Sequence, residues 1–221
     1  MNGAGVVAAL AVEARTLTAK DVRVAVSGMG QAAAARAARG LLDDGATALV
    51  SWGMAGALDP NLAAGTICLP AEVIDTQGTR FATARAWRES LVSAIGARPV
   101  TSGTLLTNPQ PIDSATAKQA AYRRTGAVAV DMESAAVAEV AVAHGVPFIA
   151  VRVIVDVAAD SLPPAVLAAT QGGQVALGRL LRGLLRSPAD IVPLMRLARR
   201  YRTAIGALEA VGSAPGLRLP A

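Results

Sequence analysis

Among the ionisable side chains that interrupt the apolar stretch at residues 129–156, four lie where a helical or strand pattern begins or ends or within a strand pattern. Asp131 and Glu133 lie where an Ala- and Val-rich helical pattern begins, and Arg152 and Asp156 lie within and at the end of a Val- and Ile-rich strand pattern. Ionisable groups are seldom buried unless they are paired or functional. Because carboxylates can donate or accept protons in catalysis, these residues are the first candidates for chemistry.

Other common catalytic groups are scarce in this chain. The single histidine, His144, precedes Gly145 at the end of a helical pattern, where a surface position is expected. The single cysteine, Cys68, falls in a strand pattern and is expected to be a buried, unreactive thiol. A Ser-His-Asp triad, a Cys-His pair and a His/Cys metal site are therefore excluded. Glu13, which follows the first strand pattern, is a further carboxylate candidate, although each of these acids could instead stabilise a helix start or act as a cap.

Two glycine-containing segments follow strand patterns. VRVAVSGMG ends in Gly28 and Gly30 and leads into a helical pattern, as in a dinucleotide-binding turn. That fingerprint also requires an acid at the end of the next strand, but this strand ends ALVSWG, so NAD binding is not expected. The turn could still hold a phosphate, a water or a ribose hydroxyl, or serve only close packing. Gly53 and Gly56 predict a second turn, where the backbone can approach a flat ligand.

Alternating strand and helix patterns are needed to bring these side chains together. Strands are predicted at 5–11, 22–28, 47–53, 66–74, 98–106, 127–132 and 146–156, and helices at 31–45, 83–96, 114–124 and 133–145. This alternation predicts an α/β layer fold with a largely parallel sheet. Functional groups of such sheets gather at the carboxyl ends of the strands. The candidate carboxylates are therefore expected to face one crevice.

The composition agrees with a single α/β domain covering residues 1–221. The chain is 53% hydrophobic, 17% charged and 3% aromatic, which predicts a core of aliphatic side chains. No apolar run is long enough to span a membrane and no signal peptide is evident, so a cytoplasmic protein is expected. The net charge of +5 is concentrated near the C-terminus, where residues 173–212 predict a basic helical extension. This extension favours an anionic membrane surface or simple packing over nucleic acid, because interleaved stacking aromatics are missing.

Five segments together resemble the purine nucleoside phosphorylase and nucleosidase superfamily. They are GVVAALAVEA with Glu13, SGMG at 27–30, GMAGAL at 53–58, VDMESAAVAEVA at 130–141 and VPFIAVRVIVD at 146–156. The catalytic positions are most similar to the methylthioadenosine/S-adenosylhomocysteine nucleosidases, whereas DSLPPAVL at 160–167 and the tail from residue 186 resemble the hopanoid-associated phosphorylases. The resemblance covers nearly the whole chain. It implies a three-layer α/β fold in which helices flank a central twisted mixed sheet.

The resemblance implies cleavage of an N-glycosidic bond through an oxocarbenium-like transition state. Asp156 would hydrogen-bond or protonate the purine N7, which requires that desolvation by the apolar strand before it favour the protonated acid. Glu133 would bind the ribose hydroxyls with Met132 packed on the sugar, and Arg152 would steady Glu133 or reach a sugar hydroxyl. Glu13 would activate the attacking water. The other residues implied to contact the substrate are Gly53, Met54, Gly56, Leu106 and Val130, and the implied water or phosphate pocket consists of Gly28 and Gly30.

Several positions depart from the nucleosidase pattern. Val155 precedes Asp156 where the nucleosidases have a serine, and Met54 replaces a serine in the glycine segment. Leu106 stands where an aromatic residue would stack on the base, and the segment 157–160 is one residue longer. These changes make the site more apolar. They argue against methylthioadenosine and fit an adenosyl group with an apolar 5′ substituent.

The sequence thus predicts a nucleosidase that releases adenine from an adenosyl compound, with adenosylhopane as the expected substrate and ribosylhopane as the product in hopanoid biosynthesis. Glu13, and the lack of an arginine set near Gly28, favour water over phosphate as the nucleophile. Phosphorolysis of the same bond and a non-catalytic nucleoside- or lipid-binding module remain alternatives. No metal or organic cofactor is expected, and phosphate would be a co-substrate only of a phosphorylase. The expected partners are a lipid-linked adenosyl substrate, a second copy in a homodimer and, through the basic tail, the inner face of a membrane.

Overall fold

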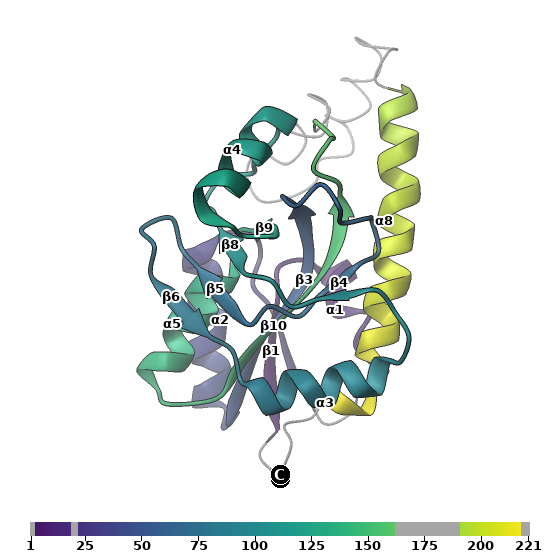
Figure 1. The fold of residues 1–221 in the computed structure, drawn as a ribbon. Coiled ribbons are helices and arrows are strands. Elements are labelled where there is room, and N and C mark those ends of the chain that lie inside the picture. The colour runs from purple at the N-terminus through teal and green to yellow at the C-terminus, as the bar shows by residue number, and fades with distance from the viewer. Residues whose placement is uncertain (1–2, 19–21, 162–190, 218–221) are drawn as a thin grey trace.

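The computed structural model describes residues 3–18, 22–161 and 191–217 (Figure 1). Its strands are β1 (Ala4–Ala8), β2 (Arg23–Val26), β3 (Ala48–Ala57), β4 (Ile67–Cys68), β5 (Glu72–Ile74), β6 (Arg80–Ala82), β7 (Val100–Thr101), β8 (Leu105–Thr107), β9 (Ala129–Asp131) and β10 (Phe148–Asp156). Its helices are α1 (Ala11–Ala14), α2 (Gln31–Asp43), α3 (Arg85–Ile95), α4 (Ala115–Thr125), α5 (Ser134–Ala143) and α8 (Ile191–Gly212), followed by the 3₁₀ turn η2 (Pro215–Leu217).

The described strands form one mixed sheet around a parallel centre. The central strand β3 pairs in parallel with β1 on one side and with β10 on the other, and β2 extends the sheet from β1. Three short strands, β4, β6 and β9, each form one antiparallel pair. The mixed sheet that the resemblance implied is therefore confirmed, whereas the strand patterns alone predicted only its parallel centre.

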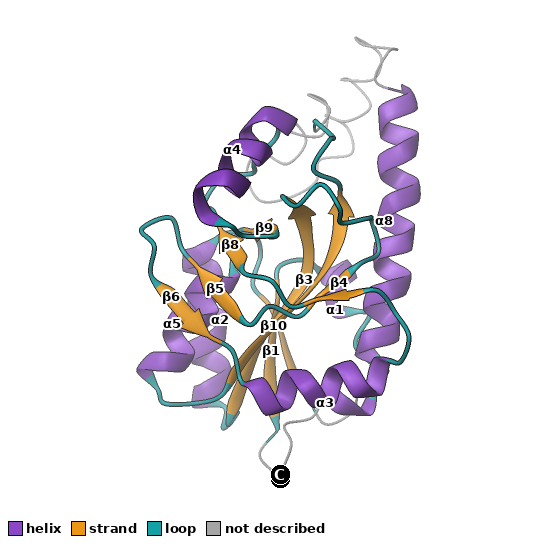
Figure 2. Ribbon diagram, in the orientation of Figure 1, coloured by secondary structure: helices purple, strands orange, loops and turns teal. Residues whose placement is uncertain are grey.

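Helices cover both faces of this sheet, which gives the molecule three layers (Figure 2). On one face, α2 and α5 bury small aliphatic side chains against the strands. On the other face, α3, α8 and η2 pack on the sheet around Trp52 and Trp87. The core is aliphatic with two buried tryptophans, as the low aromatic content predicted.

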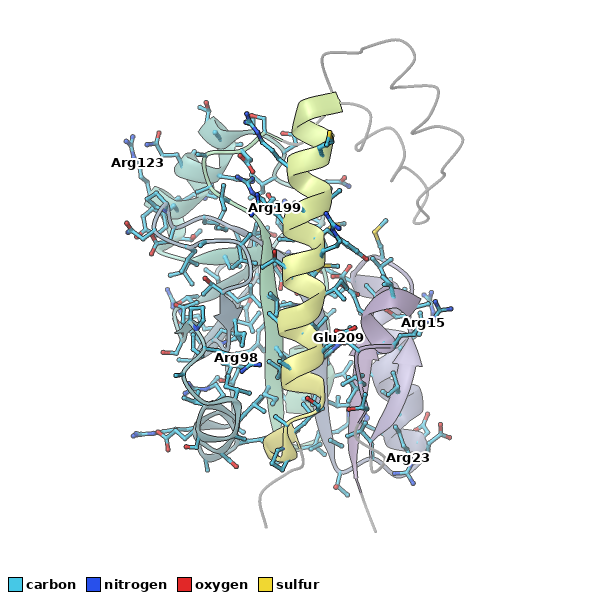
Figure 3. The ribbon with its side chains drawn as sticks, turned by 90° about the vertical axis from the view of Figure 1, so that its right-hand side faces the viewer. Arg15, Arg23, Arg98, Arg123, Arg199 and Glu209 are labelled. Carbon is cyan, nitrogen blue, oxygen red and sulfur yellow. The ribbon has the colours of Figure 1, made fainter. Side chains whose placement is uncertain are left out.

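Helix α8, the second part of the predicted basic extension, packs along the sheet (Figure 3). Ala204, Leu208 and Val211 are fully buried in the same core cluster as β1, β3 and β10. Three arginines of α8 are exposed: Arg196, Arg199 and Arg202. The first part of the predicted extension, residues 173–190, lies outside the described residues. No described helix is long and apolar enough to cross a membrane.

Several strand predictions were wrong in their extent. The strand predicted at 5–11 ends at Ala8, and the one predicted at 98–106 is two short strands, β7 and β8. β3 continues to Ala57, because its second half pairs with β10 and β9, so Gly53 and Gly56 lie in a strand and not in the predicted turn. The single strand predicted at 66–74 is two short strands, β4 and β5. Pro70 lies between them, and a proline has no N–H to donate to a strand ladder.

The single cysteine lies in the centre of the fold. Cys68 in β4 is fully buried and pairs in register with Arg152 of β10. Burial, with a smaller contribution from the charge of Asp131, raises the pKa of its thiol to about 12. The prediction of a buried thiol is confirmed, and at neutral pH this thiol carries almost no reactive thiolate.

Candidate active site

A cavity of about 220 Å³ lies beside the carboxyl end of β10 and the second half of β3. Four carboxylates from different parts of the chain line it: Glu13, Asp131, Glu133 and Asp156. Apolar side chains form much of the remaining wall: Leu10, Met29, Pro111, Ile112 and Val155. The fold thus brings the acids of the strand ends to one crevice, as the alternating pattern predicted.

Glu13 is held by backbone groups on both sides of its carboxylate. It lies in the four-residue helix α1, where Oε2 accepts a hydrogen bond from Leu10 N and Oε1 accepts one from Met54 N, each at 3.0 Å. The indole Nε1 of Trp52 donates to the Glu13 carbonyl oxygen at 3.1 Å and so anchors the short helix to β3. Burial raises the pKa of Glu13, although the charge of Arg152 and the backbone donors lower it. A fixed carboxylate with a raised pKa is suited to act as a general base.

Glu133 is a second buried acid and occupies the N-cap position of α5. Its Oε1 accepts a hydrogen bond from Gly30 N at 3.0 Å, so one N–H of the predicted phosphate-binding turn is already used. Burial raises the pKa of Glu133 to about 7; the charge of Arg152 lowers it and that of Asp131 raises it. The carboxyl group therefore changes its charge within the physiological pH range.

Arg152 lies among these acids beneath the cavity and is only 2% exposed. Its Nη2 forms a 2.6 Å ion pair with Oδ2 of Asp131 and donates to the hydroxyl oxygens of Ser51 and Ser134, at 2.6 and 3.1 Å. Burial acts to lower the pKa of Arg152, but the charges of Asp131 and Glu133 outweigh it and raise the pKa. Arg152 thus lowers the pKa of Glu133 through its charge. Its described hydrogen bonds are with Asp131, Ser51 and Ser134.

Asp156 ends β10 and carries a counter-ion that the sequence analysis did not foresee. Its Oδ2 forms an ion pair with Nζ of Lys118, a fully buried residue of α4. Desolvation by the apolar strand was expected to act alone on Asp156, whereas the structure places a cation beside its carboxyl group. Nothing in the spacing of Lys118 marks it, because α4 is otherwise a polar helix and the two residues are 38 positions apart.

The two glycines of β3 make room for these side chains. A Cβ atom at Gly53 would lie 2.6 Å from Oε1 of Glu13 and 2.6 Å from Nη1 of Arg152. A Cβ atom at Gly56 would lie 3.0 Å from Oδ1 of Asp156. The backbone at these two glycines was predicted to approach a flat ligand. The groups nearest to it are instead the protein's own ionisable side chains.

The predicted site residues divide into those on the cavity wall and those beside it. On the wall are Glu13, Met54, Gly56, Val130, Met132, Glu133 and Asp156. Gly28 and Gly30 flank Met29, which is on the wall, and Gly53 and Arg152 lie beneath it. Leu106, expected to take the place of a base-stacking residue, is instead 1% exposed in the core under α4. Its side chain packs with Leu58 and Ile74, so Ile112 and Pro111 provide the aliphatic wall at the cavity.

Sequence reasoning also missed the residues that support the acids. Ser51 and Ser134 meet at 3.0 Å beneath Arg152, and each was visible as a polar residue in an apolar pattern. Thr107 donates to Oδ1 of Asp131 at 2.7 Å and so completes this hydrogen-bond network. Within the described ranges, no group of three or more His, Cys, Asp or Glu side chains is arranged to hold a metal ion.

Comparison with known proteins extends over most of the chain. Residues 6–186 match the family model of the phosphorylase superfamily. No curated protein sequence matches significantly. The fold is similar to that of a 5′-methylthioadenosine/S-adenosylhomocysteine nucleosidase from Neisseria meningitidis (TM-score 0.70, 18% identity, 94% of this chain and 95% of that one). It is also similar to a futalosine hydrolase of Helicobacter pylori (TM-score 0.68, 16% identity, 94% and 96% covered).

Proposed function

Because this chain belongs to the phosphorylase superfamily, it is an N-glycosyl hydrolase or a nucleoside phosphorylase, and we propose that it uses water to release adenine from an adenosyl compound. The observation that carries this proposal is the charge of the cavity. The described residues that line it include four carboxylates but no lysine or arginine. Such a lining favours a cationic, oxocarbenium-like sugar and disfavours a phosphate anion.

Glu13 is proposed to activate the attacking water. Its carboxylate is fixed by two backbone N–H groups and lies on the cavity wall. The raised pKa makes it a better proton acceptor than an ordinary glutamate. A proton passes from water to this carboxylate as the water oxygen forms a bond to C1′ of the sugar, and the C1′–N9 bond breaks with its electron pair leaving on adenine.

Glu133 and Met132 are proposed to bind the ribose. Both residues line the cavity directly after β9, and the ionised carboxylate of Glu133 can accept hydrogen bonds from the 2′- and 3′-hydroxyls. The negative charge of Glu133 and Asp131 also stabilises the positive charge that develops on the sugar. Substrate binding therefore depends on the ionised form of Glu133.

Asp156 is proposed to bind the edge of the purine. The side chain is on the cavity wall at the end of β10, beside the aliphatic residues Val155 and Ile112. A carboxylate there can accept a hydrogen bond from the exocyclic amino group and stabilise a proton that N7 takes up from solvent. Protonation of N7 makes adenine a better leaving group, because the departing base then carries less negative charge.

The proposed substrate is adenosylhopane, which would give ribosylhopane. The apolar wall and the resemblance of residues 160–167 and of the tail to hopanoid-associated phosphorylases support this substrate. A contact of α8 with an anionic membrane surface is proposed for the same reason, since Arg196, Arg199 and Arg202 are exposed. A homodimer is also proposed, and the exposed Val24 and Val26 of the edge strand β2 offer an apolar surface for it.

The test is adenine release from adenosylhopane, or from a soluble adenosyl analogue, with and without phosphate. We expect adenine and a free ribosyl product without phosphate. Strict dependence on phosphate, with a ribose-1-phosphate product, would replace hydrolysis by phosphorolysis and remove the role of Glu13. Tight adenine binding without turnover of any adenosyl substrate would instead indicate a binding module.

A further inference from the structure

The mechanism proposed above leaves one buried charge at the site without a role. Lys118 in α4 has no exposed surface and is one of only two lysines in the chain. An ammonium group taken out of water loses its hydration, so a lysine is retained in a protein interior only when it is paired. A buried lysine beside the cavity is therefore expected to act on a neighbouring group.

All three donors of this ammonium group are used by the last residue of β10 and the loop that follows it. Nζ forms an ion pair with Oδ2 of Asp156 and donates to the carbonyl oxygens of Val157 and Asp160, at 3.0 and 3.2 Å. Since a lysine has three N–H donors, none is left for a ligand. Lys118 therefore makes its direct contacts with Asp156 and the loop that follows it.

A second cation holds the same loop from another helix. The carboxylate of Asp160 forms an ion pair with Arg200 of α8. Figure 1 shows α4 and α8 on either side of the end of β10, so the loop after Asp156 is tied to both. The position of Asp156 is therefore set by its neighbours before any ligand arrives.

The other carboxylate oxygen of Asp156 is left for the ligand. In the described part of the chain no group donates a hydrogen bond to Oδ1, although Asp156 lines the cavity. The preceding residue, Val155, has no hydroxyl that could bind it. Among the described residues, Lys118 thus holds one oxygen and leaves the other as an acceptor at the cavity.

We propose, on the basis of the function proposed above, that Lys118 is a positioning residue that holds the Asp156 carboxylate with Oδ1 as an acceptor at the cavity and thereby makes the site selective for 6-aminopurines. An ionised carboxylate only accepts hydrogen bonds. It can accept one from the amino group of adenine, but it repels the O6 carbonyl of hypoxanthine. Without the ammonium group, the Asp156 carboxylate loses the contact that fixes its orientation, so Oδ1 is no longer held in place to distinguish the amino group from O6.

The test compares the binding of free adenine and free hypoxanthine by titration calorimetry, which does not depend on turnover. We expect wild type to prefer adenine. In Lys118→Met, which keeps the length of the side chain without its charge, this preference falls about tenfold or more, the size of one hydrogen bond to a charged group. Arg85→Met removes an exposed cation that pairs with Glu89 and should leave the preference unchanged. An unchanged preference in Lys118→Met would overturn the proposal, since a merely structural residue lowers stability without changing which base is bound.

Two further variants keep the test decisive if Lys118→Met does not fold. Asp156→Asn and Lys118→Met/Asp156→Asn should show the same base preference as each other, because Lys118 acts only through the carboxylate. A different preference in the double variant would overturn the proposal. If wild type binds neither base and releases none, the proposed function fails and the inference fails with it. A wild type that binds adenine but prefers hypoxanthine leaves the nucleosidase proposal standing and overturns only the role of Lys118.

Discussion

At the scale of single residues, the site is governed by three buried acids that share one guanidinium. Asp131 takes the direct ion pair with Arg152, so Glu13 and Glu133 receive only its longer-range attraction. Burial then dominates, and the pKa of each of these two glutamates is raised. Arg152 thus pairs directly with Asp131, while Glu13 and Glu133 keep raised pKa values in the same cavity.

Replacing the proposed base should abolish most of the turnover. We expect Glu13→Gln to lower kcat by about 10²- to 10⁴-fold, the usual value of general base catalysis, while the Kd for adenine stays near that of wild type. The measurement is single-turnover adenine release together with calorimetry. Glu139→Gln, an exposed acid on α5, is the matched control. A kcat close to that of wild type would exclude Glu13 as the base.

Gly53 should be intolerant of even one methyl group. Its φ of 151° is in the region that favours glycine, and a Cβ atom would meet Glu13 and Arg152 at 2.6 Å. We expect Gly53→Ala to lower kcat by about 10²-fold, because displacement of a catalytic group by about 1 Å has an effect of this size. Gly78→Ala is the control, since Gly78 also has a positive φ, of 88°, but open space around it. Equal kcat in the two variants would show that the contacts of Gly53 are unimportant.

The limits of sequence reasoning are also clearest at this scale. Glu13, Glu133 and Asp156 could be found because each interrupts an apolar pattern. Lys118 could not, because its partner is distant in sequence and its helix looks like a solvent-exposed one. Leu106 was misplaced because a strand pattern does not tell which face of the strand meets a cavity and which meets the core.

At the scale of elements, the long strands and the helices followed from periodicity, whereas strand ends depended on pairing. β10 and α5 lie where their patterns placed them, within a few residues. The end of β3 could not be predicted, because glycines usually mark turns and here they make room for charged side chains. The packing of α8 on the sheet could not be predicted either, because an amphipathic basic helix can bind a membrane surface as well as a sheet.

The buried side of α8 should be needed for stability. We expect Leu208→Ala to lower the free energy of unfolding by about 2–5 kcal/mol, because the side chain is fully buried and its removal leaves a cavity. Urea denaturation followed by tryptophan fluorescence measures this change. The neighbouring exposed residue provides the control, and Glu209→Ala should change stability by no more than about 0.5 kcal/mol. Similar stability in both variants would mean that α8 detaches easily from the sheet.

At the scale of the whole molecule, stability and activity should respond to pH in opposite directions. The pKa of Glu133 is raised from 4.5 to about 7, so between these values the folded chain binds a proton that the unfolded chain has released. Stability therefore falls as pH rises from 4.5 to about 7. Binding of the sugar requires the ionised form, so kcat/KM should rise over the same range.

Thermal unfolding and initial rates measured between pH 4.5 and 8 would check that stability falls with pH while kcat/KM rises. Glu133→Gln removes the titrating group, so its Tm should depend less on pH across the interval than that of wild type, and its KM should be higher throughout. A Tm that rises with pH in wild type would contradict the assignment of a raised pKa to Glu133.

Cys68 can serve as a chemical probe of rare local openings of the sheet. As the only cysteine, and fully buried, it can react with a thiol reagent only when the structure around β4 opens. The alkylation rate of the native chain therefore reports how often the structure around Cys68 and Arg152 opens. We expect saturating adenine to slow this alkylation, because a ligand that binds the closed form makes each opening rarer. An unchanged alkylation rate would show that the structure around Cys68 opens without affecting adenine binding.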